Sequence, residues 1–156
     1  QFKDRITEKT YICLVKGAVE KGEGNIEINI TRNPILRVRM TTTTSQIGKP
    51  ATTYYKVARY FGDIATLVFA YPKTGRTHQI RVHMKYIGHP LMGDGVYGRA
   101  KEDIIFGIER QMLHALSLSF YHPRTNERVK FIARIPEDFK RAIQSINAFI
   151  EGKREI

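Results

Sequence analysis

The chain changes its pattern at residues 75–83, which read GRTHQIRVH. From Thr77 to Ile87 the less polar side chains recur at helical spacing, whereas the stretches before them follow the two-residue period of strands. Gly88 supplies a stop signal. The sequence therefore predicts a short helix that begins just after Arg76. The free N–H groups of a helix N-terminus, beside a guanidinium, form a corner that favours anions.

Strand-like stretches lie on both sides of this helix. Most alternate as half-buried strands do, and the turn at Gly62 and Asp63 predicts a hairpin. A second helix is predicted from Pro136, because apolar residues then follow one helical face. The strands are predicted at residues 10–15, 25–31, 36–41, 52–61, 64–71, 113–121 and 128–135. We expect a single domain, residues 1–156, with an α+β fold: a mainly antiparallel mixed sheet and a few packed helices.

Two stretches carry more specific expectations. In the first predicted strand, Tyr11 and Cys13 lie on one face while Ile12 and Leu14 lie on the other. Residues 41–46 have no apolar period and are predicted to form an exposed, mobile loop.

Composition narrows the classes of partner and compartment. Lys and Arg number 26 against 15 Asp and Glu, a net charge of +11, which favours a polyanionic partner such as nucleic acid. The single cysteine, Cys13, excludes a disulfide framework and a cysteine pair for zinc, and fits a reducing, cytoplasmic compartment. No apolar run approaches the ~18 residues that cross a bilayer, so no membrane partner is expected.

The motif at residues 75–83 continues as IGHP at 87–90, GD at 93–94 and YG at 97–98. Upstream lie KTYICLVKG at 9–17 and GKPAT at 48–52, and downstream lie LHA at 113–115 and FYHP at 120–123. Together, and in this order, these motifs resemble the RluA family of RNA pseudouridine synthases. Nearly the whole chain has a counterpart in that family.

The resemblance implies a pseudouridine synthase-like fold and the isomerisation of uridine to pseudouridine in structured RNA, ribosomal or transfer RNA. The base is detached from its ribose, turned and rejoined through carbon, with no cofactor and no metal implied. In the family an aspartate of a His-Arg-Leu-Asp motif acts on the nucleoside, an arginine pairs with it and a tyrosine lies against the flipped base. Tyr11 and Arg76 match the last two and are the expected catalytic residues. An aromatic face can stack on uracil, and arginine stays charged.

Further residues are predicted to bind substrate or RNA. They are Thr77, His78, Gln79 and Arg81 of the motif, Lys49 as a phosphate contact, and Leu118, which resembles a leucine that lines the family's uridine pocket.

The chain departs from the family pattern at the aspartate, since no His-Arg-Leu-Asp motif occurs in it. None of its aspartates has the family's surroundings, and Asp94, between Gly93 and Gly95, is predicted to form a turn. We therefore expect the chain to be the C-terminal portion of a catalytic domain, inactive alone. A partial sheet would also expose a strand edge that favours self-association.

Two other readings stay open. The chain can be a non-catalytic RNA-binding module with the same fold, which an upstream His-Arg-Leu-Asp motif would exclude. It can also be a structural or partner-binding protein whose motifs only hold the fold, which an absence of RNA binding at low salt would favour.

Overall fold

The fold is built on a six-stranded sheet in which every neighbouring pair is antiparallel, in the order β2-β5-β6-β1-β7-β8. The computed structural model describes residues 1–3 and 6–154. The six strands are β1 (Glu8–Lys16), β2 (Glu23–Glu27), β5 (Thr52–Phe61), β6 (Ala65–Pro72), β7 (Leu113–Tyr121) and β8 (Arg128–Ile132). The remaining elements are a two-stranded sheet of β3 (Asn29–Arg32) and β4 (Met40–Thr43), the helices α1 (Gln79–Tyr86), α2 (Ala100–Asp103) and α3 (Glu137–Arg154), and a 3₁₀ turn at Ile104–Phe106. The expected α+β fold with antiparallel pairing is confirmed.

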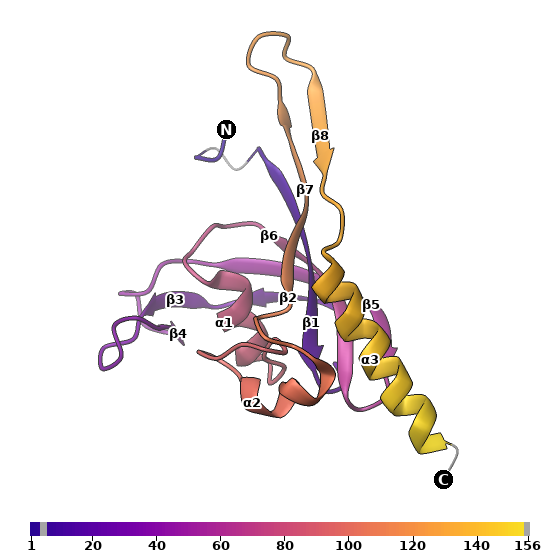
Figure 1. The fold of residues 1–156 in the computed structure, drawn as a ribbon. Coiled ribbons are helices and arrows are strands. Elements are labelled where there is room, and N and C mark those ends of the chain that lie inside the picture. Colours follow the sequence, from indigo (N-terminus) through magenta and orange to yellow (C-terminus); the bar gives the residue numbers. More distant parts are fainter. Residues whose placement is uncertain (4–5, 155–156) are drawn as a thin grey trace.

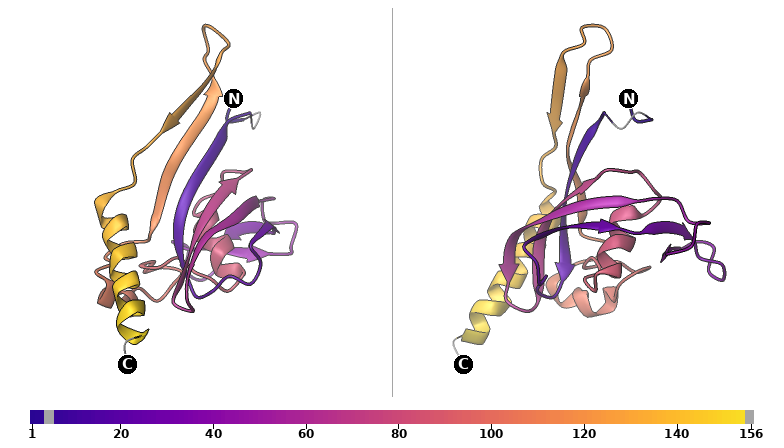
Figure 2. Two further views of the ribbon diagram at one scale, coloured as in Figure 1. Left: turned by 90° about the vertical axis from the view of Figure 1, so that its right-hand side faces the viewer. Right: turned by 180° about the vertical axis from the view of Figure 1, so that it is seen from behind.

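The central strand β1 separates two cores, because alternate side chains of a strand point to opposite faces. Ile12 and Leu14 pack with Phe139 and Ile146 of α3 on one face. Cys13 and Val15 pack on the other face, with Ile80 and Met84 of α1. Figure 2 shows α1 and α3 on opposite sides of the sheet. The two-faced strand predicted at residues 10–15 is therefore confirmed.

The β7–β8 hairpin extends beyond the rest of the sheet, and the N-terminal residues lie near it, as Figure 1 shows. Strand β8 is an edge strand, and its Phe131 and Ile132 are 62% and 70% exposed. At the opposite side of the molecule, β3 and β4 form a second hairpin away from the main sheet. The two hairpins leave α1 and its preceding loop between them.

The predicted β5–β6 hairpin, with Gly62 at φ 54°, is present, as are both predicted helices. Three predictions need correction. The strand predicted at 25–31 divides after Glu27, so that its first half pairs with β5 and its second half with β4. The strand predicted at 36–41 is a turn followed by β4, and the predicted loop at 41–46 starts as that strand. Periodicity continues through Ile26, Ile28 and Ile30 because all are at least half-buried, although their strands belong to different sheets.

No helix among residues 1–3 and 6–154 has the length and apolar composition needed to span a membrane.

Candidate functional site

A pocket of about 530 Å³ opens between β1, the end of β6 and the start of α1. This volume lies within the range of small-molecule sites. Both expected catalytic residues, Tyr11 and Arg76, line it. So do His78, Gln79 and Arg81, which the sequence predicted to bind substrate. The fold thus brings residues from two distant motifs to one cavity.

Arg76 lies in the loop between β6 and α1 and is held at both its backbone and its side chain. Its Nε donates to the carbonyl oxygen of Pro50 at 2.9 Å, and its backbone N–H donates to Oε1 of Gln79 at 3.0 Å. A guanidinium has five N–H donors. The bond from Nε fixes the orientation of the group and leaves the N–H groups of its two terminal nitrogens for a ligand. Arg76 therefore lines the pocket as an oriented cation.

Gln79 is buried and has all its polar positions engaged within the protein. Its Oε1 accepts from the hydroxyl of Thr74 and from the backbone of Arg76, and its Nε2 donates to the carbonyl of Thr52 and to Oγ1 of Thr53. These four hydrogen bonds hold the Gln79 amide within the protein, although its side chain also lines the pocket. The amide anchors the loop that carries Arg76.

The buried chain of hydrogen bonds continues from Thr53 to His83, which is fully buried. His83 Nε2 lies 3.1 Å from the carbonyl oxygen of Ile28 and must donate to it, so Nδ1 accepts from Thr53 Oγ1 at 2.8 Å. Burial lowers the pKa of His83, although its bond to Ile28 opposes the shift. A neutral His83 thus completes a network that reaches from Ile28, between β2 and β3, to the Arg76 loop.

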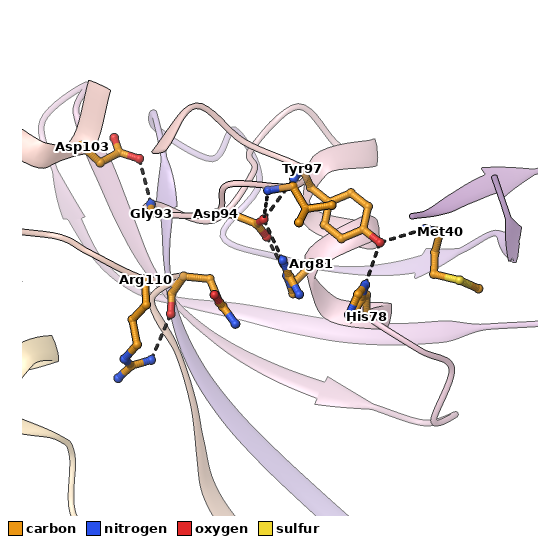
Figure 3. Close-up of polar contacts among 10 residues, drawn as sticks. Met40, His78, Arg81, Gly93, Asp94, Tyr97, Asp103 and Arg110 are labelled. Carbon is orange, nitrogen blue, oxygen red and sulfur yellow. Dashed lines mark hydrogen bonds and ion pairs between the residues drawn. The ribbon is translucent and has the colours of Figure 1, made fainter. Parts of the chain in front are cut away.

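Arg81 forms a side of the pocket and is paired with a buried carboxylate. Its Nε and Nη2 donate to Oδ2 and Oδ1 of Asp94 at 2.7 and 2.9 Å, and its guanidinium lies 5.1 Å from the ring centre of Tyr97 (Figure 3). Burial alone would raise the pKa of Asp94, but the bonds from Arg81 and from the N–H groups of Tyr97 and Val96 outweigh it and hold this pKa below its usual range. The predicted turn at Asp94 is confirmed by those two backbone bonds.

The other predicted RNA contacts lie outside this pocket. Lys49 and Thr77 line an adjacent depression together with Arg76 and Arg32, beside the β3–β4 hairpin. Leu118 lies in β7 and lines an apolar depression on the other side of Tyr11. Tyr11 therefore separates the Leu118 surface from the cationic one.

Lys9 is a pocket residue that the sequence analysis did not select. It lies on β1 two positions before Tyr11, lines the pocket, and has its pKa lowered by burial. A Cβ atom placed on Gly75 would lie 3.5 Å from its Nζ, so its amine reaches the loop of Arg76. The alternation of a strand could have identified it, because residues two apart share a face. Lys9 and Arg76 make this pocket cationic, whereas the charge of Arg81 is balanced by Asp94.

Comparison with known proteins identifies the family. A family model described as RNA pseudouridylate synthase matches residues 1–86, more than half of the chain. The chain belongs to the RNA pseudouridylate synthase family. The resemblance to its RluA members is confirmed by curated relatives. The ribosomal large subunit pseudouridine synthase D of Nitrosomonas europaea is 40% identical over 94% of this chain, and the ribosomal large subunit pseudouridine synthase C of Escherichia coli is 36% identical over 94%.

A solved RNA pseudouridylate synthase structure agrees. Human RNA Pseudouridylate Synthase Domain Containing 1 superposes with a TM-score of 0.71 at 35% identity, covering 86% of this chain and 57% of that one. The chain spans less than half the length of the two bacterial pseudouridine synthases, 43% and 47%. The comparison therefore concerns a part of these enzymes.

None of the described aspartates lines the pocket, and each is paired with a cation or exposed. Asp94 pairs with Arg81, Asp103 with Lys16, and Asp138 with Arg110. Asp63 lies exposed in the β5–β6 turn, and Asp4 falls outside the described residues. No residue lining the pocket, in the described part of the chain, carries a carboxylate.

Proposed function

We propose that this chain forms the base-holding half of an RNA pseudouridine synthase active site, in which uridine is isomerised to pseudouridine. The observation that carries the proposal is the convergence of Tyr11 with the guanidinium groups of Arg76 and Arg81 on one pocket. An aromatic face holds an unstacked uracil, and a guanidinium orients a carboxylate or a phosphate. The target base must leave the helical stack, because its glycosidic carbon is inaccessible there.

We further propose that the catalytic carboxylate comes from outside these 156 residues, which form a single domain portion C-terminal to it. The absent His-Arg-Leu-Asp motif and the lack of a carboxylate in the described pocket support this. In the assembled site, the tyrosine lies against the base while an arginine pairs with the incoming aspartate. Arg76 is the first candidate for the arginine that pairs with this aspartate, because it matches the family motif. Arg81 is the better shielded guanidinium, with a side chain 11% exposed, and is the second candidate.

Ribosomal RNA is the proposed substrate, because two relatives are named for the ribosomal large subunit, and transfer RNA is the alternative. The net charge of +11 supports binding to a structured polyanion. The free, buried Cys13 and an RNA substrate support a cytoplasmic location.

The test is a mass-spectrometric assay for pseudouridine on ribosomal and transfer RNA. It compares this chain with a protein extended to include a His-Arg-Leu-Asp segment. We expect activity only from the extended protein, and a loss of at least about 100-fold in Tyr11→Ala and in Arg76→Lys or Arg81→Lys, the scale of a positioned catalytic group. Arg141→Lys, on the exposed face of α3, is the control and stays active. Activity of the short chain alone would overturn the proposal of an external carboxylate.

A non-catalytic RNA-binding module is the second candidate, favoured by the pocket that lacks a carboxylate. An extended protein that binds RNA at low salt yet forms no pseudouridine would support it over the enzyme.

We also propose that the outer edge of β8 mediates self-association of the isolated chain. An unpaired strand edge offers free backbone groups, and Phe131 and Ile132 add exposed apolar surface to it. Sedimentation should detect dimers or larger species that Ile132→Lys reduces. A strictly monomeric wild-type chain at high concentration contradicts the proposal.

A further inference from the structure

His78 has a strained backbone at the side of the pocket. It is the residue before α1, and its φ of 55° lies in the left-handed region. Residues other than glycine adopt this region infrequently, and histidine is among those that do so more often than most. Strained positions beside a cavity point to a role for the side chain that occupies them.

The position of the imidazole proton follows from the contacts of Tyr97. The phenol oxygen of Tyr97 accepts from the backbone N–H of Met40 at 2.8 Å and lies 2.8 Å from Nδ1 of His78 (Figure 3). Among the described residues, His78 Nδ1 is the one hydrogen-bond partner of this hydroxyl that can accept its proton. The phenol therefore donates to Nδ1, and the proton of a neutral imidazole must sit on Nε2.

The surroundings of the ring keep it in this form. Burial and the charge of Arg81 both lower the pKa of His78, while the more weakly acting Asp94 opposes them. A protonated ring would also direct Nδ1–H at the phenol oxygen and leave the phenol proton without its acceptor. The rings of His78 and Tyr97 meet edge to face, with centres 5.5 Å apart, which fixes the ring plane.

The opposite nitrogen, Nε2, is free to act on a ligand. It has no hydrogen-bond partner in residues 1–3 and 6–154, and it is not among their enclosed, unsatisfied atoms. His78 lines the same pocket as Tyr11, Arg76 and Arg81. The charged groups there are suited to phosphate or carboxylate, whereas a neutral N–H is a directional donor that carries no charge.

We propose that His78 Nε2–H donates a hydrogen bond to a carbonyl oxygen of the bound pyrimidine base, and that Tyr97 is the positioning residue that fixes its tautomer. The proposal rests on the function proposed above, since the base must be the one that enters this pocket. Tyr97 also holds Met40, the first residue of β4. The β3–β4 hairpin and the donor to the base therefore share one anchor.

The first measurement needs no RNA. Nitrogen-15 NMR of histidine-labelled chain at neutral pH, with His78 assigned from its loss in His78→Gln, should show an unprotonated Nδ1 and a protonated Nε2. Tyr97→Phe should convert this signal to a mixture of tautomers. An Nδ1–H tautomer or an imidazolium in the wild-type chain overturns the proposal, whether or not the variants fold.

The second measurement titrates the labelled chain with a uridine-containing oligonucleotide and with the same strand abasic at that position. We expect the Nε2–H signal of His78 to move with the uridine strand alone, and His78→Gln to bind that strand about 10-fold more weakly, the loss of one good hydrogen bond. His89, which bonds the carbonyl of Lys16 and lies outside this pocket, is the internal control.

The outcomes separate the two proposals. Binding that leaves the His78 signal unchanged, or moves it equally with the abasic strand, overturns the donor to the base while the proposed function stands. No binding of either strand at low salt overturns the proposed function and the base as the ligand of His78 together.

Discussion

At the scale of single residues, the pocket depends on side chains whose hydrogen bonds are made within the protein. Gln79 directs four hydrogen bonds inward, and one of them holds the backbone of Arg76. Each buried partner left unpaired costs about 1–3 kcal/mol, so a shape-matched apolar replacement has a large effect. The motif glutamine therefore matters for where the arginine stands.

We predict that Gln79→Leu lowers the free energy of unfolding by at least about 2 kcal/mol, because it strands the N–H of Arg76 and the carbonyl of Thr52. Chemical denaturation followed by circular dichroism measures this. Gln144→Leu, at an exposed position of α3, is the matched control and should change stability by less than about 0.5 kcal/mol. Equal effects of the two substitutions would contradict the role given to Gln79.

A second residue-scale prediction concerns acid. Burial lowers the pKa of His83 in the folded protein, so the folded protein binds fewer protons than the unfolded chain. The contribution of neutral His83 to the free energy of unfolding is complete above the pKa of unfolded histidine, about 6.5. It is lost as pH falls below that value, by about 1.4 kcal/mol for each unit between the unfolded and folded pKa.

Unfolding at pH 7, 6 and 5 should therefore show a decline that His83→Gln reduces, because the lowered pKa of His78 supplies the remainder, and that His122→Gln, at an exposed turn, retains. Asp94 acts in another window, because a lowered carboxyl pKa affects stability only as pH falls below about 3.9. A wild-type stability that is constant from pH 7 to 5 would argue against a neutral, buried His83.

At the scale of elements, the loop from α1 to β7 is set by one glycine. Gly93 has φ 75°, and a Cβ atom there would lie 2.0 Å from the carbonyl oxygen of Arg110. Its own N–H donates to Oδ2 of Asp103 at 2.8 Å. The chain at this point can therefore hold only glycine without moving the strand that follows.

We predict that Gly93→Ala destabilises the protein by more than about 2 kcal/mol, through both the backbone angle and the contact with Arg110. Gly95→Ala is the matched control, since a Cβ atom at Gly95 meets nothing within 4 Å. The difference in denaturation midpoint between the two variants measures the effect. Two equal midpoints would show that the loop shifts freely.

The elements also show what sequence patterns can predict. Strand β1, the β5–β6 hairpin and helix α3 were predicted closely, because each has a clear period and its own stop signal. The division between β2 and β3 was missed, since alternation indicates which face is buried and not which sheet a strand joins. In the pocket, the motif identified Arg76 and Arg81. The partner of Arg81 and the role of Gln79 depend on contacts between segments that only the fold brings together.

At the scale of the whole molecule, the net charge of +11 governs encounter with RNA. We predict that the logarithm of the binding constant falls linearly with the logarithm of salt concentration, as counterions leave the phosphates. Lys49 lies with Arg76 in the depression beside the β3–β4 hairpin. Lys49→Ala should reduce the salt slope by about 1, the value for one phosphate contact.

Lys153→Ala, at the far end of α3, is the control for this slope and should leave it unchanged (Figure 1). Filter binding or fluorescence anisotropy at several salt concentrations gives both values. A slope that Lys49→Ala leaves unaltered would remove Lys49 from the RNA surface.

The central place of β1 has a consequence for how the chain folds. Tyr11 pairs with Ala70 of β6 on one side and with Ala115 of β7 on the other. The strand in the middle of the sheet therefore pairs with strands that are synthesised much later. Closing such long loops costs entropy before any contact repays it, and folding slows accordingly. Until β7 leaves the ribosome, one edge of β1 lacks its partner strand, and its apolar residues are open to chaperones that bind short hydrophobic segments.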